Sequence, residues 1–202
     1  MDDTNCSCRG CNGQPDGGRW LESIDDPLPA DLATVLTRFN TEGMVRTLDD
    51  WISVIGRERG AALPVDDLCH VPGPSPHHGF VEEQRYDFAC CVDAVILAAI
   101  VDNRVDIHTM SPDGTAISID ATSDGAVTAS PLDTVFSFGA DPTVSVGDPP
   151  VPGDAYRAIC PWVHAFPDIK AYHAWDDSHE IPTVAFAPVT ATVLARRLAG
   201  RD

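Results

Sequence analysis

Two cysteines and an aspartate carry the most specific chemical signal in the sequence. Cys90 and Asp93 lie three residues apart at the start of an apolar segment, a spacing that puts them on one face of a helix, whereas Cys91 points away from Asp93. A buried aspartate is costly unless it has partners or a task, and a desolvated carboxyl can carry a proton at neutral pH. The alternative is structural, with Asp93 capping the helix and the thiols filling the core.

Three further cysteines form a Cys-x-Cys-x-x-Cys cluster near the N-terminus. Cys6, Cys8 and Cys11 lie within six residues, and such thiols could hold Hg(II), Zn(II) or Cu(I). The cluster is one ligand short of a closed zinc site unless Cys69 or His70 supplies the fourth. A metal role for the cluster, in capture or in structure, therefore stays open.

The histidines give a weaker signal. His77 and His78 lie in a Pro/Gly-rich segment and are either metal ligands or solvated loop residues. His164 lies in an apolar stretch, where a lone histidine is more often a hydrogen-bonded core residue than a ligand. Trp162, Phe166 and Trp175 lie near it in the sequence and are expected in the core or in a pocket wall.

The elements that must position these side chains follow from periodicity, turns and breakers. Helices are expected over 29–40, 47–57, 88–101, 154–160 (capped by Asp154), 172–178 and 189–198, and strands over 80–87, 105–110, 115–120, 126–130, 134–138 and 183–187. The pattern predicts an α+β fold, in which a small helical, winged-helix-like N-terminal region precedes a mostly antiparallel sheet core flanked by helices. The boundaries are a mobile cysteine-containing tail over 1–19, the helical region over 20–63, a linker over 64–79 and a core over 80–202.

The composition excludes several classes of protein. The formal net charge is −18, which argues against nucleic-acid and anionic-membrane binding, since both need a basic face. Of the 31 acidic residues 25 are Asp, and Lys170 is the one lysine, a balance that predicts adaptation to a salt-rich cytoplasm. The longest apolar run, over 88–101, is too short to span a membrane and is interrupted by Asp93.

The N-terminus predicts a cytoplasmic protein. It lacks the apolar segment of a secretory signal, so the seven cysteines are expected to be thiols. The sequence contains neither a phosphate-binding glycine loop nor a serine nucleophile elbow.

Two stretches in order resemble the organomercurial (alkylmercury) lyase family. The first is Tyr86-Asp-Phe-Ala-Cys-Cys-Val-Asp93, followed by the strands over 105–130, and the second is Tyr156-Arg-Ala-Ile-Cys-Pro-Trp-Val-His-Ala-Phe166. The family has a Cys-x-x-Asp motif that opens a helix and a second Cys about 60–70 residues later. The resemblance covers 80–198, so that 80–202 is expected to be the catalytic core. The sequence departs from the family at Pro161, where a second Cys is common, at Thr109 or Met110, where a further Cys is often found, and at the extra Cys91.

The resemblance implies a function and its residues. The expected activity is protonolysis of carbon–mercury bonds to a hydrocarbon and Hg(II), with the two mercury-binding thiols at Cys90 and Cys160 and the acid at Asp93. The expected partners are an organomercurial, small thiols and a mercuric reductase as Hg(II) acceptor, with no cofactor.

Three other functions remain open at this point. They are a non-catalytic soft-metal binding or delivery protein on the same scaffold, a metal- or redox-sensing regulator, and a different cysteine-nucleophile enzyme with His164 as its base. The buried acid at Asp93 favours protonolysis over binding alone. The acidic charge disfavours the regulator.

Overall fold

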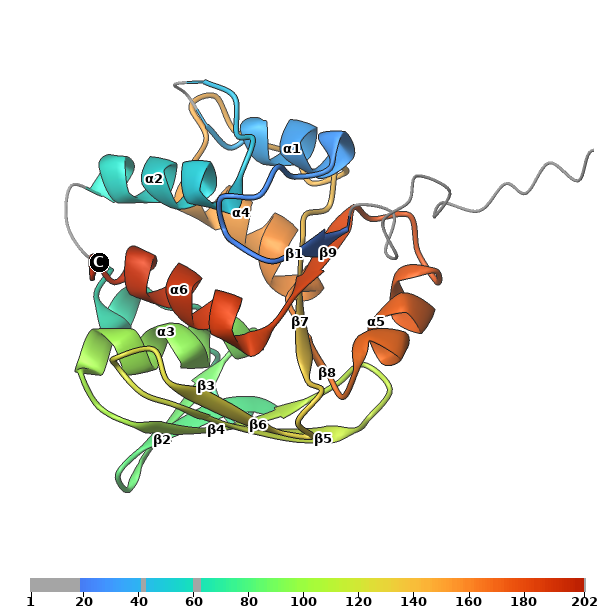
Figure 1. Ribbon diagram of the computed structural model, residues 1–202. Helices are drawn as coiled ribbons and strands as arrows, with labels where there is room; N and C mark the ends of the chain where they lie inside the picture. The colour runs from blue at the N-terminus through green and yellow to red at the C-terminus, as the bar shows by residue number, and fades with distance from the viewer. Residues whose placement is uncertain (1–18, 41–42, 60–62, 202) are drawn as a thin grey trace, which may run out of the picture.

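The computed structural model describes residues 19–40, 43–59 and 63–201, which form two β-sheets, six α-helices and two 3-10 helices (Figure 1). The strands are β1 (Trp20–Leu21), β2 (His77–Val81), β3 (Gln84–Phe88), β4 (Val105–Met110), β5 (Ala116–Ala121), β6 (Val127–Ser130), β7 (Val135–Gly139), β8 (Ala165–Phe166) and β9 (Thr183–Phe186). The helices are α1 (Ala30–Thr37), α2 (Leu48–Arg59), η1 (Val65–Asp67), α3 (Cys91–Val101), α4 (Pro152–Ile159), η2 (Cys160–Trp162), α5 (Ile169–Asp176) and α6 (Pro188–Leu198). None of the described helices is long and apolar enough to cross a membrane.

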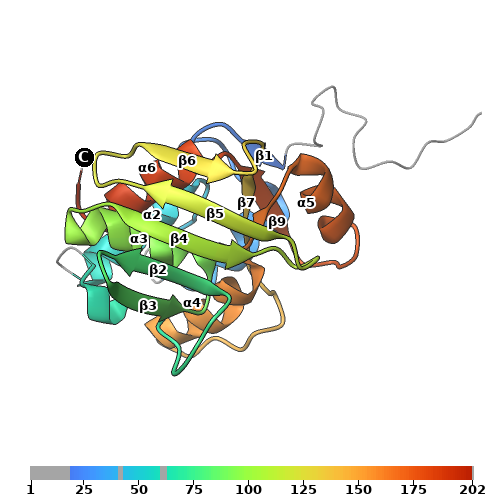
Figure 2. The same cartoon turned by 90° about the horizontal axis from the view of Figure 1, so that it is seen from below.

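The larger sheet is antiparallel, in the order β3-β2-β4-β5-β6, and one of its faces is buried. Along β4, Val105 and Ile107 are buried whereas Asp106 and His108 are exposed, as expected for a sheet with one solvated face. Helices α3 and α6 cover the buried face (Figures 1 and 2). Helix α3 therefore packs against the buried face of this sheet.

Helix α3 is the central element of the molecule. Apart from Asp93 it is apolar on all sides, and its residues from Cys91 to Ala99 are all buried, which is typical of a helix enclosed by other elements. A Cβ built on Gly79 of β2 would lie 2.8 Å from the Val105 side chain and 3.6 Å from the Ala94 side chain of α3. The absence of a side chain at Gly79 therefore lets the helix and the sheet approach closely.

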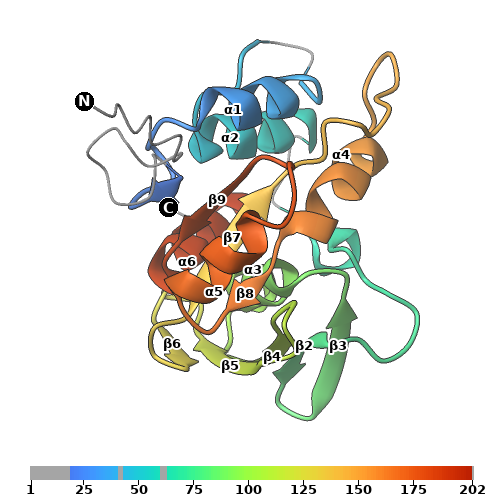
Figure 3. The ribbon, with the colours of Figure 1, turned by 90° about the vertical axis from the view of Figure 1, so that its right-hand side faces the viewer.

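The smaller sheet has the order β1-β9-β7-β8, so that the first strand of the described chain pairs with the last. Strand β1 runs parallel to β9, and β7 pairs antiparallel with both β9 and β8. All five residues of β7 are buried. Figure 3 shows α1 and α2 together at one end of the molecule and the larger sheet at the other. The N-terminal helices are thus packed on the core rather than set apart from it, and α2 contacts α6.

The α+β class is confirmed, with a mostly antiparallel core flanked by helices. The two predicted N-terminal helices are α1 and α2, but a winged helix is not confirmed, since the strand described in this region, β1, pairs with β9. The domain boundaries stay a prediction. The segment over 64–79 contains η1 and the first residues of β2, and the segment over 1–18 lies outside the described residues.

Several element predictions were wrong in detail. The helix expected over 172–178 is α5, which spans Ile169–Asp176, and the helix expected over 88–101 begins at Cys91. The single strand expected over 80–87 is the hairpin of β2 and β3, with its turn at Glu82, whose φ is +55°. The helix expected over 154–160 begins earlier, at Pro152. Asp154 is consequently inside the first turn of α4, where its carboxylate accepts hydrogen bonds from the backbone N–H groups of Gly147 (3.0 Å) and Val151 (3.2 Å).

Candidate active site

Cys90 and Asp93 meet at the N-terminus of α3. Cys90 is the N-cap residue, in an extended conformation, and Asp93 is in the first turn. The Cys90 thiol donates a hydrogen bond to Asp93 Oδ2 at 3.0 Å. The spacing of three residues thus places thiol and carboxyl together, as the sequence predicts.

Cys160 reaches the same place from another part of the chain. It is the residue at which α4 ends and η2 begins. Its thiol donates a hydrogen bond to the Cys69 sulfur at 3.3 Å and also interacts with Cys90. The structure therefore brings together Cys90, Asp93 and Cys160, whose functional roles remain the proposal developed below.

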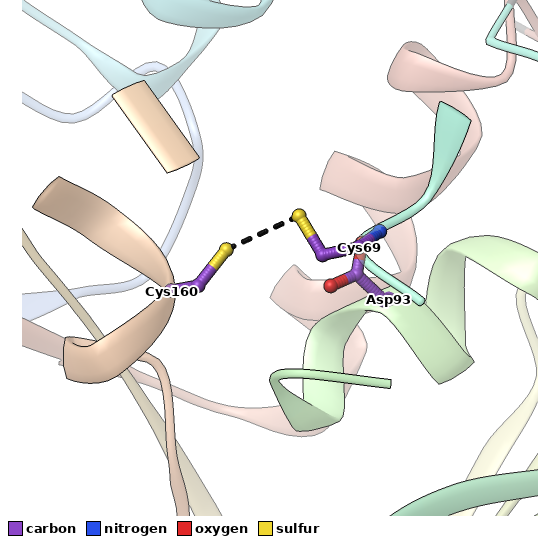
Figure 4. Close-up of side chains that lie close together, drawn as sticks. All are labelled: Cys69, Asp93 and Cys160. Atoms are coloured by element: carbon purple, nitrogen blue, oxygen red, sulfur yellow. Dashed lines mark hydrogen bonds between the residues drawn. The ribbon is translucent and has the colours of Figure 1, made fainter. Parts of the chain in front are cut away.

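Cys69 is the site residue that the sequence interpretation did not place here. One ligand atom each from Cys69, Asp93 and Cys160 lies within 4.8 Å of the other two, and Figure 4 shows the three side chains converging from separate segments. Cys69 precedes β2, and its carbonyl accepts a hydrogen bond from Ala89 N–H at 2.7 Å. This backbone pairing puts Cys69 beside the residue that comes before Cys90.

The electrostatics of the site keep its protons on the thiols. Burial raises the pKa of Asp93, although hydrogen bonds from the Cys90 thiol and the Cys69 N–H oppose the shift. The hydrogen bond with Cys160 lowers the pKa of Cys90, but burial and the charge of Asp93 outweigh it and raise that pKa to about 11. Hydrogen bonds with Cys69 and Cys90, together with burial, raise the pKa of Cys160. Asp93 is therefore the acceptor nearest to the Cys90 proton.

An apolar cavity of about 170 Å³ adjoins these groups. Its polar lining side chains, among the described residues, are Cys69, Cys90, Asp93, Tyr156 and Cys160. The other lining residues are Phe39, Trp51, Val54, Ile55, Val92, Ile96, Phe138, Pro150, Val151, Pro152, Ala155, Ile159, Val163, Leu194 and Leu198. Helix α2 and Phe39, which follows α1, thus supply one wall of the cavity, a contribution that the sequence interpretation did not foresee.

Cys91 lies apart from the site, as the helical phase predicts. It is fully buried, and its thiol points to the carbonyl of Val163 at 3.8 Å. Burial raises its pKa strongly. Cys91 does not line the cavity, so among the described cysteines it serves as the natural control.

Three of the histidines, His77, His78 and His164, do not line the cavity that holds the thiols. His77 Nδ1 contacts the Thr109 hydroxyl at 2.6 Å, and His78 Nδ1 contacts the Ser75 carbonyl at 3.0 Å. His164 packs edge-on against Trp175 with ring centroids 5.1 Å apart. Burial, with His77 nearby, lowers the His164 pKa to about 4. An imidazole with so low a pKa is a weak base, so His164 fits the core role better than the role of a catalytic base.

Two further predictions concern the same regions. Trp162 and Trp175 pack on each other with centroids 5.9 Å apart and do not line the apolar cavity, and neither does Phe166. His70 lies at the surface, where Nε2 contacts the Val65 carbonyl at 2.8 Å. The cluster of Cys6, Cys8 and Cys11 lies outside the described residues, so its metal role stays a prediction.

Comparisons with known proteins decide the family. The alkylmercury lyase (MerB) family model matches residues 72–200, which is more than half of the chain. The chain belongs to the alkylmercury lyase family. A solved structure described as the mercury-bound form of MerB2 has the same fold, with a TM-score of 0.53 and 14% identity over 86% of this chain and 92% of that one. No curated protein sequence matches the chain.

The segment that matches the alkylmercury lyase family covers some of the site residues and not others. Cys90, Asp93 and Cys160 all lie inside residues 72–200. Cys69 lies just before them, as do Phe39 and α2 with their part of the cavity wall. The site thus combines a core covered by the family model with a third thiol that the match does not cover.

Proposed function

We propose that this alkylmercury lyase family member cleaves carbon–mercury bonds by protonolysis, with Cys90, Asp93 and Cys160 as its catalytic residues. The observation that carries the assignment is the buried carboxyl of Asp93, hydrogen-bonded at 3.0 Å to a thiol on the wall of an apolar cavity. A protein that only bound mercury would need the thiols. The buried acid would then add an unfavourable desolvation without a function.

The chemistry of mercury explains the residue types. Mercury is a soft cation and prefers thiolates to oxygen ligands. Two thiolates donate electron density to the metal and so to the carbon bonded to it, which becomes a latent carbanion. This carbon needs a proton from a nearby acid as its bond to mercury breaks.

The half-buried thiol of Cys160 is the more accessible of the two catalytic cysteines, since Cys90 is only 5% exposed. In the proposed reaction, Cys160 captures the organomercurial from a small thiol, which leaves with the proton of Cys160. Asp93 then takes the proton of Cys90, and the Cys90 thiolate binds mercury. Protonated Asp93 delivers this proton to the carbon, the hydrocarbon leaves, and Hg(II) stays on Cys90 and Cys160. No electrons are gained or lost, so the balance requires no cofactor.

The cavity accounts for the organic group. Apolar cavities of about 150 Å³ bind benzene and stay dry, and the cavity here, of about 170 Å³, has an apolar wall. A phenyl or alkyl group fits there while mercury faces the thiols. A dry wall also favours the neutral form of Asp93, which is the form that donates the proton.

The setting of the reaction is part of the proposal. Small thiols, and a mercuric reductase where one is present, take over the Hg(II). The acidic, lysine-poor composition supports a salt-rich cytoplasm as the compartment. The reducing conditions of a cytoplasm keep the cysteines as thiols. The enzyme is proposed to act there on diffusible organomercurials, without nucleic acid or membrane.

The test is benzene release from phenylmercury in the presence of excess small thiol. Cys90→Ser and Cys160→Ser should each lower turnover at least about a thousandfold, since each removes a mercury ligand. Cys91→Ser is the matched control, a thiol next to Cys90 that points elsewhere, and should keep most of the activity. Near-normal turnover in Cys160→Ser would contradict the assignment.

A further inference from the structure

The proposed cleavage uses two thiols, but the site holds three. The Cys160 thiol hydrogen-bonds the Cys69 sulfur at 3.3 Å, and Cys69 forms with Asp93 and Cys160 a cluster of possible ligand atoms within 4.8 Å (Figure 4). Cys69 lies outside the segment that the family model matches. Its presence at the site therefore needs an explanation of its own.

The backbone holds Cys69 in place. Its carbonyl accepts a hydrogen bond from Ala89 N–H at 2.7 Å, and its N–H points to Asp93 Oδ1 at 3.5 Å. The next residue, His70, forms a β-bridge with Phe88. These contacts tie Cys69 to both the residue before Cys90 and the carboxyl of Asp93, so the approach of the third thiol is built into the fold.

Cys69 also lies between two cavities. It lines the inner apolar cavity together with Cys90 and Asp93. It lines as well an open outer depression, whose other walls include Asp66, Asp67 and His70. Cys90, Asp93 and Cys160 line the inner cavity but not the outer depression. Among the described cysteines, Cys69 is thus the one that reaches both spaces.

We propose that Cys69 is the exit thiol of the enzyme: it takes Hg(II) from Cys90 after cleavage and presents the metal to small thiols in the outer depression. This inference rests on the proposed function. It assigns a binding role to a residue that the cleavage itself does not use, and it gives the product a path away from the buried pair.

The transfer balances without an oxidant or a reductant. After cleavage Asp93 is a carboxylate, because its proton has gone to the hydrocarbon. The Cys69 sulfur bonds to mercury and its proton passes to Asp93; the Cys90–mercury bond then breaks, and Cys90 takes that proton from Asp93, 3.0 Å away. Mercury is left on Cys69 and Cys160. Two small thiols then displace these cysteines in turn, each passing its proton to the thiolate that leaves.

The experiment separates cleavage from release. Wild type, Cys69→Ser and Cys69→Ala are mixed with excess phenylmercury and a small monothiol, and benzene is quantified by rapid quench from the first turnover into the steady state. Cys91→Ala is the matched control. In both Cys69 variants the first equivalent of benzene should appear at the wild-type rate, followed by a steady state about tenfold slower. A higher concentration of the small thiol should restore much of the loss.

A second measurement follows the metal. After one turnover at low thiol concentration, the protein is separated from small molecules and its retained Hg(II) is measured. The Cys69 variants should retain Hg(II) severalfold longer than the wild type, whereas Cys91→Ala should match it.

The outcomes separate the exit role from the proposed function. A steady state equal to that of the wild type in both folded Cys69 variants would overturn the exit role. Loss of the first equivalent of benzene would also overturn it, because Cys69 would then belong to the cleavage step. A wild-type protein that makes no benzene would instead contradict the proposed function.

Discussion

At the scale of single residues, Asp93 has two opposing properties. Burial raises its pKa, so the ionised carboxyl is unfavourable in the folded protein. In the proposed reaction, the same burial, with the Cys90 thiol at 3.0 Å, suits it both to accept a thiol proton and to donate a proton to a developing carbanion. Active sites commonly hold groups that lower stability in exchange for reactivity.

Replacement of Asp93 should therefore separate stability from activity. An Asp whose folded pKa is raised contributes stability that is full below its usual value of 3.8 and is lost as pH rises through the folded value. Asp93→Asn removes that loss, so its unfolding free energy should exceed that of the wild type increasingly as pH rises from acidic to neutral. Denaturant titrations across this range measure the difference. A difference in unfolding free energy that does not grow in favour of the variant as pH rises would contradict the account.

The kinetic effect of the same substitution should depend on pH as well. Turnover should fall about 10²- to 10⁴-fold, the usual contribution of a general acid or base. Under the proposed mechanism Asp93 accepts the Cys90 proton in the wild type, so the rate of mercury binding by Cys90 should be nearly flat around neutral pH. In Asp93→Asn the proton must go to solvent, and the rate should rise towards alkaline pH. Stopped-flow measurement of the rate at which Cys90 binds mercury, repeated across this pH range, tests the prediction. The same pH dependence in the wild type and in the variant would contradict it.

Local spacing could predict part of the site but not all of it. Cys90 and Asp93 were predictable because three residues along a helix fix their proximity. The position of Cys160 came from the resemblance. Cys69 was missed because its approach depends on backbone pairing with Ala89, which leaves no periodic signal in a segment rich in proline and glycine.

At the scale of elements, the position of α3 on the larger sheet decides where the site lies. The helix was predictable from its apolar run and the strands β4 to β6 from alternation and turns. The β2–β3 hairpin was not, because its turn is formed at Glu82 and carries neither Gly nor Asn. The start of α4 was misplaced because Asp154 has the residue type of an N-cap but bonds from within the first turn.

Gly79 gives a direct test of the helix–sheet contact. In Gly79→Ala the new Cβ would meet the buried Val105 side chain at 2.8 Å, so the unfolding free energy should fall by about 1–3 kcal/mol. Gly153→Ala is the control. Gly153 lies in the first turn of α4, and a Cβ there would meet only the Arg157 side chain, at 3.7 Å. That change should be neutral or stabilise by up to about 1 kcal/mol. Equal effects of the two substitutions would argue against close packing at Gly79.

At the scale of the whole molecule, the site joins parts that are far apart in the sequence. The inner cavity is lined by Phe39, α2, the segment before β2, α3, α4 and α6. The composition predicts the charge of the surface, but it does not predict that these segments meet at one cavity. The net charge of −18 indicates strong repulsion between surface carboxylates at low salt.

The charge predicts a salt dependence of stability. Screening lengths fall from about 10 Å at 0.1 M salt to about 3 Å at 1 M, so the unfolding temperature at neutral pH should rise steadily up to molar KCl. Near the sequence pI of about 4.4 the same titration should be nearly flat, which serves as the control. An unfolding temperature that falls with KCl at neutral pH would contradict salt adaptation.

The most direct test of the central claim is the fate of the phenyl group of phenylmercury in D₂O. The protein is incubated with an excess of phenylmercury and small thiol, and both the released hydrocarbon and the protein adduct are measured by mass spectrometry. Protonolysis through the exchangeable proton of Asp93 predicts many equivalents of singly deuterated benzene and a protein that carries Hg(II) without phenyl. A protein that retains intact phenylmercury and releases no benzene would contradict the account and identify a binding protein.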